Sequence, residues 1–298
     1  MVFPAAQRPT VNYYDCYPKK RKSDVKQSKT KRMGQHFLKN ARAVKKIISS
    51  ISPQGDDLII EIGAGRGALT FPLAKKAGKI IAIEKDRSFI SFLSSHHQSN
   101  LVILGEDVLK IDFKELIEKE KNSKINIKIV GNLPYSISTP LLFKVLEARD
   151  SWQECVFLMQ KEVAERITAQ PGCKQYAPLS IIFQIYFEVK IHFFLSPKVF
   201  YPPPQVDSAL ISLKKRDSPL YLLEDETGFL KFLKVAFRHR RKLLANNLKF
   251  LRYSPQIIED CYQKLSLKHN LRAEELTIGQ FVELFNFFQS LEITPNPP

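Results

Sequence analysis

The segment from Leu58 to Lys76 constrains the fold of this 298-residue chain more than any other. It begins as an apolar strand, passes through the glycine-rich turn Gly63-Ala64-Gly65-Arg66-Gly67 and continues with helical spacing. Glycines at such a turn permit a sharp change of direction and a close approach of the backbone to a ligand. The spacing is G-x-G-x-G, which differs from the G-x-G-x-x-G of dinucleotide sites. We therefore predict an α/β domain in which this turn lines a ligand site. The alternative is a tight turn that binds no ligand.

Three further strands are predicted, and a polar residue follows each of them: Glu84, Asp107 and Asn132. Glu84 lies 21 positions after Gly63 (84 − 63 = 21), close to the usual offset for an acid that binds ribose hydroxyls. Open α/β sheets bind ligands at the carboxyl ends of their strands, so these residues predict one shared site. The plainer alternative makes Glu84 a surface acid. The three strands span 79–83, 101–104 and 125–131.

The tetrad Asn132-Leu133-Pro134-Tyr135 has the chemistry needed to hold an exocyclic amino group for methylation. An aromatic amine such as N6 of adenine is a poor nucleophile, because its lone pair is spread into the ring. The side-chain oxygen of Asn132 and the backbone carbonyl of Pro134 can accept its hydrogens and localise that lone pair. Tyr135 then offers a flat surface for the base. The alternative is an ordinary strand exit that ends at the proline.

The net charge of +16 is concentrated in two segments. Residues 1–40 hold ten Lys or Arg and two Asp, and residues 231–252 hold eight Lys or Arg and no acid, so each segment contributes +8. This pattern favours a nucleic-acid partner over a solvated tail and an ordinary basic helix face. An anionic membrane is less favoured, since no amphipathic anchor accompanies the charge. The candidate phosphate-binding side chains are Arg238, Arg240, Arg241 and Lys242.

Several classes of protein are excluded by composition. No apolar run reaches the roughly 18 residues of a membrane span. The four cysteines form no C-x-x-C pair and have no clustered histidines, so no metal site or disulfide framework is expected. We expect a cytoplasmic protein. An organelle transit peptide is the alternative, although Asp15 and Asp24 in the basic arm weaken it.

The chain is expected to divide into a flexible basic arm (1–30), an α/β domain (31–216) and a helical domain (217–298). We expect His36 to lie at the edge of the ligand site. The alternative is a histidine with only a structural role. The proline-framed loop at Phe200 is expected to present that ring for stacking, with core packing as the alternative. The remaining elements expected are helices at 41–51, 68–76, 139–148, 161–167, 229–250, 255–265 and 278–291, and strands at 155–159, 188–194 and 206–213.

Taken in order, five motifs resemble those of the KsgA-type ribosomal RNA adenine dimethyltransferases, a family related to the Erm methylases and mitochondrial transcription factor B. The resemblance runs from about Lys31 to the C-terminal helices. The sequence of the motif from Pro202 to Ser208 is closer to that of the ribosome-assembly enzymes than to that of the Erm branch. The motifs span 34–38, 61–65, 132–135, 202–208 and 240–242.

The resemblance implies a Rossmann-like methyltransferase sheet that binds S-adenosylmethionine (SAM), with a small all-helical C-terminal domain. It implies dimethylation of N6 of adenines in small-subunit ribosomal RNA by a monomer. Asn132, Pro134, Tyr135 and Phe200 would hold the adenine. The cofactor would contact Glu84 through its ribose, Asp107 through its adenine, and also His36, Leu38, Gly63, Gly65 and Asn132.

Two alternatives stay open. An Erm-like enzyme would act on large-subunit RNA, and a factor of the transcription factor B type would bind nucleic acid without catalysis. The intact Glu84, Asp107 and Asn132 argue against lost catalysis. A methyltransferase for small molecules or proteins would not need two segments of +8 charge.

Overall fold

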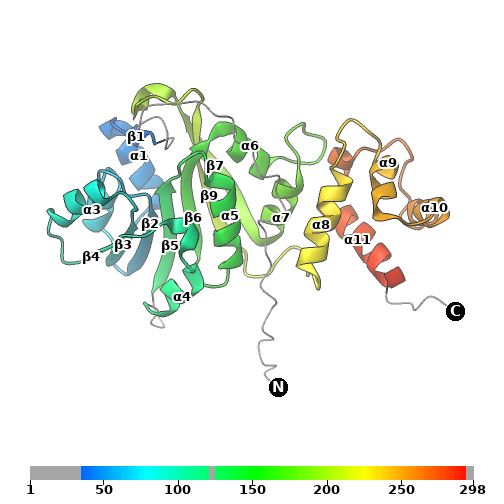
Figure 1. Cartoon of the computed structure of the whole chain (residues 1–298), viewed down its shortest axis with the longest axis horizontal. Coiled ribbons are helices and arrows are strands. Elements are labelled where there is room, and N and C mark those ends of the chain that lie inside the picture. Colours follow the sequence, from blue (N-terminus) through cyan, green and yellow to red (C-terminus); the bar gives the residue numbers. More distant parts are fainter. Residues whose placement is uncertain (1–34, 121–124, 293–298) are drawn as a thin grey trace, which may run out of the picture. The chain divides into compact units, whose positions relative to one another are not determined.

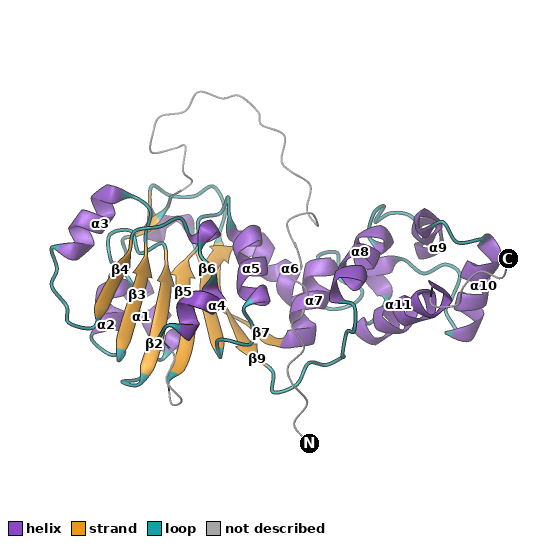
Figure 2. Cartoon of the chain, turned by 60° about the horizontal axis from the view of Figure 1, so that its bottom comes forward, coloured by secondary structure: helices purple, strands orange, loops and turns teal. Residues whose placement is uncertain are grey.

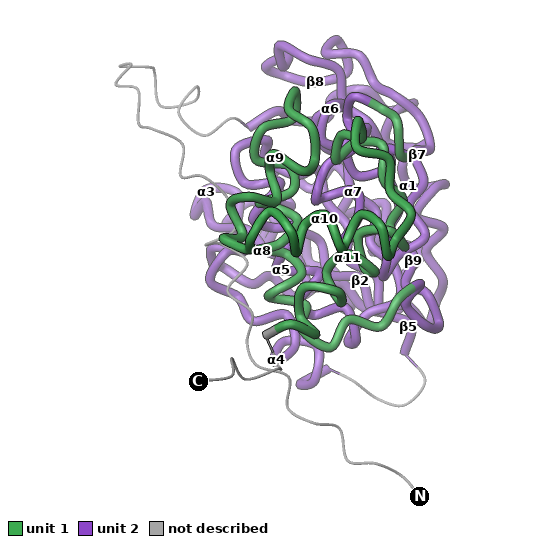
Figure 3. The backbone as a smooth tube through the Cα atoms, turned by 90° about the vertical axis from the view of Figure 1, so that its right-hand side faces the viewer, with its two compact units in different colours: residues 1–24, 171–173, 221–298 green, residues 25–170, 174–220 purple. Residues whose placement is uncertain are grey.

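The computed structural model describes residues 35–120 and 125–292. The expected basic arm, 1–30, lies outside these residues. The chain divides into two units, which we describe separately (Figure 3). Among the described residues, 35–120, 125–170 and 174–220 form the sheet unit, and 171–173 with 221–292 form the helical unit. The chain passes from the sheet unit to the helical unit after Leu220, and the domain boundary expected at residue 217 stays a prediction.

A seven-stranded sheet forms the centre of the sheet unit, in the order β4-β3-β2-β5-β6-β9-β7 (Figure 1). The first five strands in this order are parallel, and β9 runs antiparallel to both β6 and β7. The strands span Asp57–Ile62 (β2), Lys79–Ile83 (β3), Leu101–Leu104 (β4), Asn126–Asn132 (β5), Glu154–Gln160 (β6), Phe187–Leu195 (β7) and Ser208–Lys215 (β9). Each strand of this sheet was predicted to within about two residues.

Helices cover both faces of this sheet (Figure 2). Parallel strands covered on both faces are mostly apolar, and every residue of β2 is buried, including its two acids, Asp57 and Glu61. The helices expected at 41–51 and after β5 and β6 are confirmed. The helices α3, α4 and α7 were not predicted. The helices of this unit span Ala41–Ile51 (α1), Thr70–Ala74 (α2), Arg87–Ser94 (α3), Phe113–Glu118 (α4), Ser138–Glu147 (α5), Lys161–Thr168 (α6) and Pro178–Tyr186 (α7).

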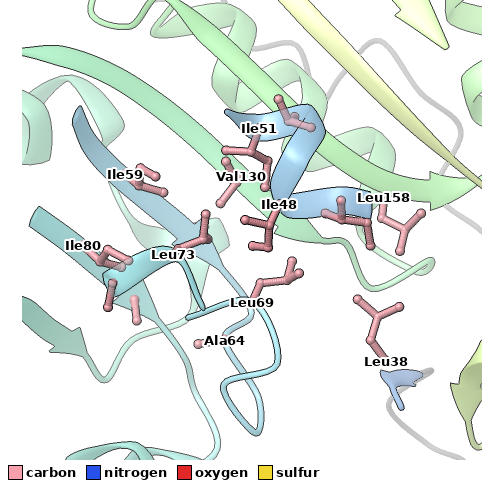
Figure 4. Close-up of a cluster of buried hydrophobic side chains, with 14 of the residues drawn as sticks. Leu38, Ile48, Ile51, Ile59, Ala64, Leu69, Leu73, Ile80, Val130 and Leu158 are labelled. Carbon is pink, nitrogen blue, oxygen red and sulfur yellow. The ribbon is translucent and has the colours of Figure 1, made fainter. Parts of the chain in front are cut away.

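One hydrophobic cluster joins α1 and α2 to the sheet (Figure 4). Ile48 and Ile51 of α1 and Leu73 of α2 pack with Ile59 of β2 and Val130 of β5. Side chains alternate along a strand, so Glu61 shares the face of Ile59 and points toward the same helices. The cluster therefore fixes the start of α2, and with it the glycine turn, against the end of β2.

A buried ion pair lies at the opposite end of these strands. Lys128 Nζ of β5 is 2.7 Å from Asp57 Oδ2 of β2 and also donates to the backbone carbonyls of Ile51 and Ser52, where α1 ends. The other oxygen of Asp57 accepts from the side chain of Asn126. The charge of Lys128 is thus compensated by one carboxylate and two carbonyl dipoles.

Two short strands, β1 (Phe37–Leu38) and β8 (Phe200–Tyr201), form a separate antiparallel pair that was not predicted. Phe37 pairs with Tyr201, and Leu38 pairs with Phe200. Leu38 and Phe200 both belong to the buried cluster, while Tyr201 is 69% exposed. The alternation of side chains therefore places Phe37 and Tyr201 on the opposite face of this pair.

The helical unit contains α8 (Glu226–Ala236), α9 (Leu244–Leu248), α10 (Pro255–Lys264) and α11 (Ile278–Glu292). The prediction of a single helix over 229–250 was wrong, because the chain turns between α8 and α9. The buried Asn247 stabilises this turn: its side chain donates to the carbonyl of Ala236 and accepts from the amide of His239. The basic residues 238–242 therefore lie on a turn and not on a helix.

Candidate active site

A pocket of about 340 Å³ lies at the carboxyl ends of the parallel strands. It lies at the point where the strand order reverses, since β2 has β3 on one side and β5 on the other. Ile62 of β2 pairs with Gly131 of β5, so the segments that follow these two strands lie side by side. The pocket is lined by residues 35–37, 62, 63, 65, 83–85, 106–108 and 132–137.

The glycine turn forms one wall of the pocket. Gly63 and Gly65 have φ angles of +71° and +53°, which disfavour any residue with a Cβ. A Cβ on Gly65 would also lie 3.1 Å from the ring of Phe37. The turn thus brings bare backbone to the wall of the pocket, and the binding of a ligand there stays a prediction.

Glu84 is almost fully buried at the edge of the pocket. Its Oε2 accepts from the amide of Gly65 at 2.8 Å, and its Oε1 accepts from the amides of Lys85 and Asp86 at 2.9 Å. These bonds orient the carboxylate and tie it to the glycine turn. The second lone pair of Oε2 remains for a ligand hydroxyl.

Asp107 follows β4 and also lines the pocket. Its Oδ1 accepts from the amide of Leu109 and so caps a short 3-10 helix, Val108–Lys110. Its Oδ2 is 3.7 Å from the ammonium of Lys85, an exposed cation. One carboxylate oxygen is therefore structural, and the other can accept a donor from a ligand.

The amide group of Asn132 is oriented by the backbone beside it. Its Nδ2 donates to the carbonyl oxygen of His36 at 2.7 Å. Within the part of the chain that the structure describes, no donor is recorded for its Oδ1. The acceptor end of Asn132 is consequently available in the pocket that the residue lines.

The imidazole of His36 is fixed by the proline loop. Its Nδ1 lies 2.7 Å from the carbonyl oxygen of Pro202, which can only accept, so Nδ1 carries the proton. The ring centroids of His36 and Tyr135 are 5.2 Å apart. His36 therefore lines the pocket and supports both Asn132 and Tyr135, and its contact with a ligand stays a prediction.

Tyr135 is held by a partner that the sequence did not reveal as functional. Its hydroxyl is 2.6 Å from the hydroxyl of the buried Ser208, the first residue of β9. Burial raises the pKa of Tyr135, with the Ser208 hydrogen bond opposing the rise. The phenol thus stays protonated. The only signal in the sequence was that Ser208 ends the motif beginning at Pro202.

The carbonyl of Pro134 is not free for a target amine, contrary to the prediction. It accepts from the amide of Ile137 and from the hydroxyl of Ser138, each at 3.1 Å, as α5 begins. A carbonyl oxygen has two lone pairs, and both are engaged. By contrast, no hydrogen bond to the carbonyl of Leu133 is recorded among the described residues. Leu133 also lines the pocket.

Two other predicted site residues face the core. Phe200 is completely buried and belongs to the hydrophobic cluster beneath α1 and α2, so the alternative of core packing describes it in this structure. Leu38 is 8% exposed and belongs to the same cluster, so it does not line the pocket. Its neighbour Phe37 does, because adjacent residues of a strand face opposite ways.

Glu61 is a buried acid of β2, one residue before Ile62 of the pocket lining, and no separate role was predicted for it. One of its carboxylate oxygens has no hydrogen-bond partner. Burial raises the pKa of Glu61 to about 7, the Thr70 hydroxyl opposes this rise, and the charge of Glu84 adds to it. A proton on Glu61 therefore removes one of two neighbouring negative charges.

The predicted RNA-binding cations lie on the turn between α8 and α9. Arg240 forms an ion pair with Glu274 at 3.0 Å, and the guanidinium of Arg238 lies 4.1 Å from the ring centroid of Phe250. Arg241 and Lys242 are exposed. The four side chains are thus gathered on one turn, although two of them also make contacts within the protein.

Within residues 35–120 and 125–292, no group of three or more His, Cys, Asp or Glu could hold a metal ion. No described helix is both long and apolar enough to cross a membrane. The described cysteines, Cys155, Cys173 and Cys261, are free thiols.

Comparison with known proteins agrees with the family resemblance of the five sequence motifs. Residues 26–290 match the sequence model of a family described as ribosomal RNA adenine dimethylase. Ribosomal RNA small subunit methyltransferase A of Alcanivorax borkumensis is 38% identical over 257 residues, which cover 86% of this chain and 89% of that protein. The protein of the same name from Caldanaerobacter subterraneus is 37% identical over 258 residues, or 86% and 96% of the two chains.

Solved structures agree with these sequence matches. A dimethyladenosine transferase from Plasmodium falciparum has a TM-score of 0.72 at 27% identity, covering 87% of this chain and 99% of that one. The 23S rRNA methyltransferase ErmE has a TM-score of 0.63 at 21% identity, covering 85% and 99%. The second likeness shows the fold alone.

Proposed function

The chain belongs to the ribosomal RNA adenine dimethylase family, and from this we propose that it transfers methyl groups from SAM to N6 of adenines in small-subunit ribosomal RNA during ribosome assembly. The observation that carries the proposal is the fixed orientation of Asn132. Its amide nitrogen is already bonded to His36, and its oxygen is left for an amine. The names of the relatives from Alcanivorax and Caldanaerobacter support the small subunit as the source of the RNA.

The pocket has the chemistry to hold SAM. Gly63 and Gly65 supply bare backbone, and Glu84 has an oxygen left for a ribose hydroxyl. Asp107 can accept from an exocyclic amine of the cofactor's adenine. The acidic edge formed by Glu84, Glu106 and Asp107 suits a cationic ligand. When bound, SAM supplies an electrophilic methyl group on a sulfonium centre.

The target amine is oriented by two acceptors. We assign them to Oδ1 of Asn132 and to the carbonyl oxygen of Leu133, because the carbonyl of Pro134 is already engaged. Together they hold both hydrogens of N6 and direct its lone pair along the line of attack. The ring of Tyr135, fixed by Ser208, gives the adenine a surface for stacking.

No strong base is needed in this mechanism. The nitrogen becomes acidic only after it has gained the methyl group, and it then loses a proton readily to water. Catalysis comes from orientation and from the placement of acceptors where positive charge develops. Phe200 is not part of this assignment, since its ring lies in the core.

Replacement of Asn132 by Ala tests the proposal. We expect methyl transfer to fall by roughly a hundredfold or more, because one acceptor that orients the amine is lost. The affinity for SAM, measured by calorimetry, should change little. Exposed Asn246 replaced by Ala is the control. Near-normal transfer by Asn132→Ala would contradict the orientation role.

The substrate is tested separately, by transfer of labelled methyl groups to immature small-subunit particles and to large-subunit RNA, followed by nucleoside analysis. Dimethyladenosine in the small-subunit RNA is the expected result. Label only in large-subunit RNA would indicate an enzyme that acts like the Erm methylases. SAM binding without transfer to either RNA would indicate a binding factor.

A further inference from the structure

A second hollow in the sheet unit, of about 580 Å³, has a basic rim that the proposed chemistry does not use. We call it the lysine groove. Its rim carries Lys39, Lys45, Lys75 and Lys76, and its apolar floor includes Val44 and Ile48 of α1. Lys39 follows β1, Lys45 lies on α1, and Lys75 and Lys76 follow α2.

The four ammonium groups of the rim lack a protein counter-charge. All four lysines are exposed, and no acid lines the groove. None of the four forms an ion pair with any described residue, whereas Lys79 pairs with Glu120 in the same unit. Like charges gathered around one hollow repel each other and destabilise the fold, unless an anion binds between them.

The position of the groove identifies the anion. Phe37 lines the catalytic pocket and its neighbour Leu38 lines the groove, so a single strand, β1, separates the two hollows. A nucleic-acid strand carries a phosphate at every nucleotide. When an adenine enters the pocket, the backbone beside it is the nearest dense source of negative charge. The basic residues 1–34 of the chain itself have the wrong sign to fill the groove.

We propose that the lysine groove binds the ribose-phosphate backbone of the RNA segment that flanks the target adenine. This inference rests on the proposed function, because it takes RNA as the substrate. Phosphates would meet the ammonium groups of the rim, and the apolar floor would pack against riboses. The groove would then set how the RNA strand leaves the pocket, and the Asn132 tetrad would act only on the adenine.

The test is a double variant, Lys45→Ala with Lys76→Ala, in the full chain. The KM for the RNA particle should rise by about tenfold, because two phosphate contacts are lost. The kcat at saturating RNA and the affinity for SAM should stay unchanged, since neither residue lines the catalytic pocket. The matched control removes two exposed lysines elsewhere in the unit, Lys114→Ala with Lys190→Ala, and should leave KM within about twofold.

A binding assay with unmethylated RNA fragments and no SAM separates this proposal from the proposed function. Weaker RNA binding by the groove variant than by the control supports the groove, even if no methyl transfer is found. Equal KM and equal RNA binding in the two variants would overturn it. Equal RNA binding, combined with loss of binding to poly-glutamate, would assign the groove to an acidic protein and would also overturn it.

Discussion

Tyr135, the ring proposed to stack on the adenine, depends on a residue far away in the chain. Its hydroxyl meets Ser208 across the sheet, and its ring packs beside His36. Without the serine, the phenol would keep its place in the pocket but lose the bond that fixes its angle. A base stacked on it would then be held less precisely.

We therefore predict that Ser208→Ala lowers kcat several-fold and leaves the affinity for SAM unchanged. Tyr135→Phe should have a similar effect, because it removes the same hydrogen bond from the other side. The double variant should be little worse than either single variant, since a shared bond can be lost only once. Fully additive losses would show that Ser208 acts on something other than Tyr135.

Glu61 gives the stability of the protein a dependence on pH. Its pKa is about 7 in the folded chain, against an ordinary value of 4.5. Between these values the folded state binds more protons than the unfolded state, so the free energy of unfolding falls as the pH rises from about 4.5 to about 7. The loss is at most roughly 3 kcal/mol.

We expect Glu61→Gln to remove this contribution, because the amide cannot ionise. Urea unfolding should show the variant gaining stability relative to the native chain between pH 5 and pH 8. Glu115→Gln, at an exposed carboxylate, serves as the control. A stability difference that is the same at both pH values would mean that Glu61 does not titrate in this range.

The sequence predicted best the site residues that follow the strands of the parallel sheet. Glu84, Asp107 and Asn132 all line the pocket, because parallel strands bring their carboxyl ends to one edge. Leu38 and Phe200 were misjudged because a two-residue strand has no readable alternation, and only its pairing fixes which side chains turn inward. The carbonyl of Pro134 was misjudged because its occupancy depends on how α5 begins.

At the scale of elements, the single helix predicted over 229–250 was wrong for a similar reason: the pattern of the sequence does not show tertiary contacts. Apolar spacing continues past α8, so it predicts one long helix. The chain turns instead because the buried side chain of Asn247 bonds to backbone groups of Ala236 and His239. Such a tertiary cap cannot be read from periodicity, which reports only the faces of a helix.

The packing of α1 against β2 and β5 depends on the buried ion pair of Lys128 and Asp57. We predict that Lys128→Met lowers the free energy of unfolding by about 3–5 kcal/mol, because Asp57 would remain buried without its cation. Urea unfolding measures this loss. Lys119→Met, which breaks an exposed pair with Glu115, should cost less than about 1 kcal/mol. Equal losses in the two variants would contradict the importance of burial.

At the scale of the whole molecule, both units have exposed cations that form no ion pair with a described residue. The sheet unit has the lysine groove, and the helical unit has Arg241 and Lys242 on its basic turn. The sequence located the second set from its local charge density. It could not locate the first, because Lys39 and Lys76 are far apart in the chain and come together only through the packing of α1 and α2.

If both sets contact one RNA, their contributions to its salt dependence should add. Removing Arg241 and Lys242 should make the slope of log affinity against log salt shallower by about 1.4–1.8, as expected for two phosphate contacts. Adding Lys45→Ala and Lys76→Ala should double that change to about 3. Binding titrations from low to physiological salt measure it, with Lys264→Ala and Lys268→Ala, which lie outside the basic segment 231–252, as the control for two lost charges. A combined slope no shallower than that of either pair alone would mean that one RNA does not bind both sets at once.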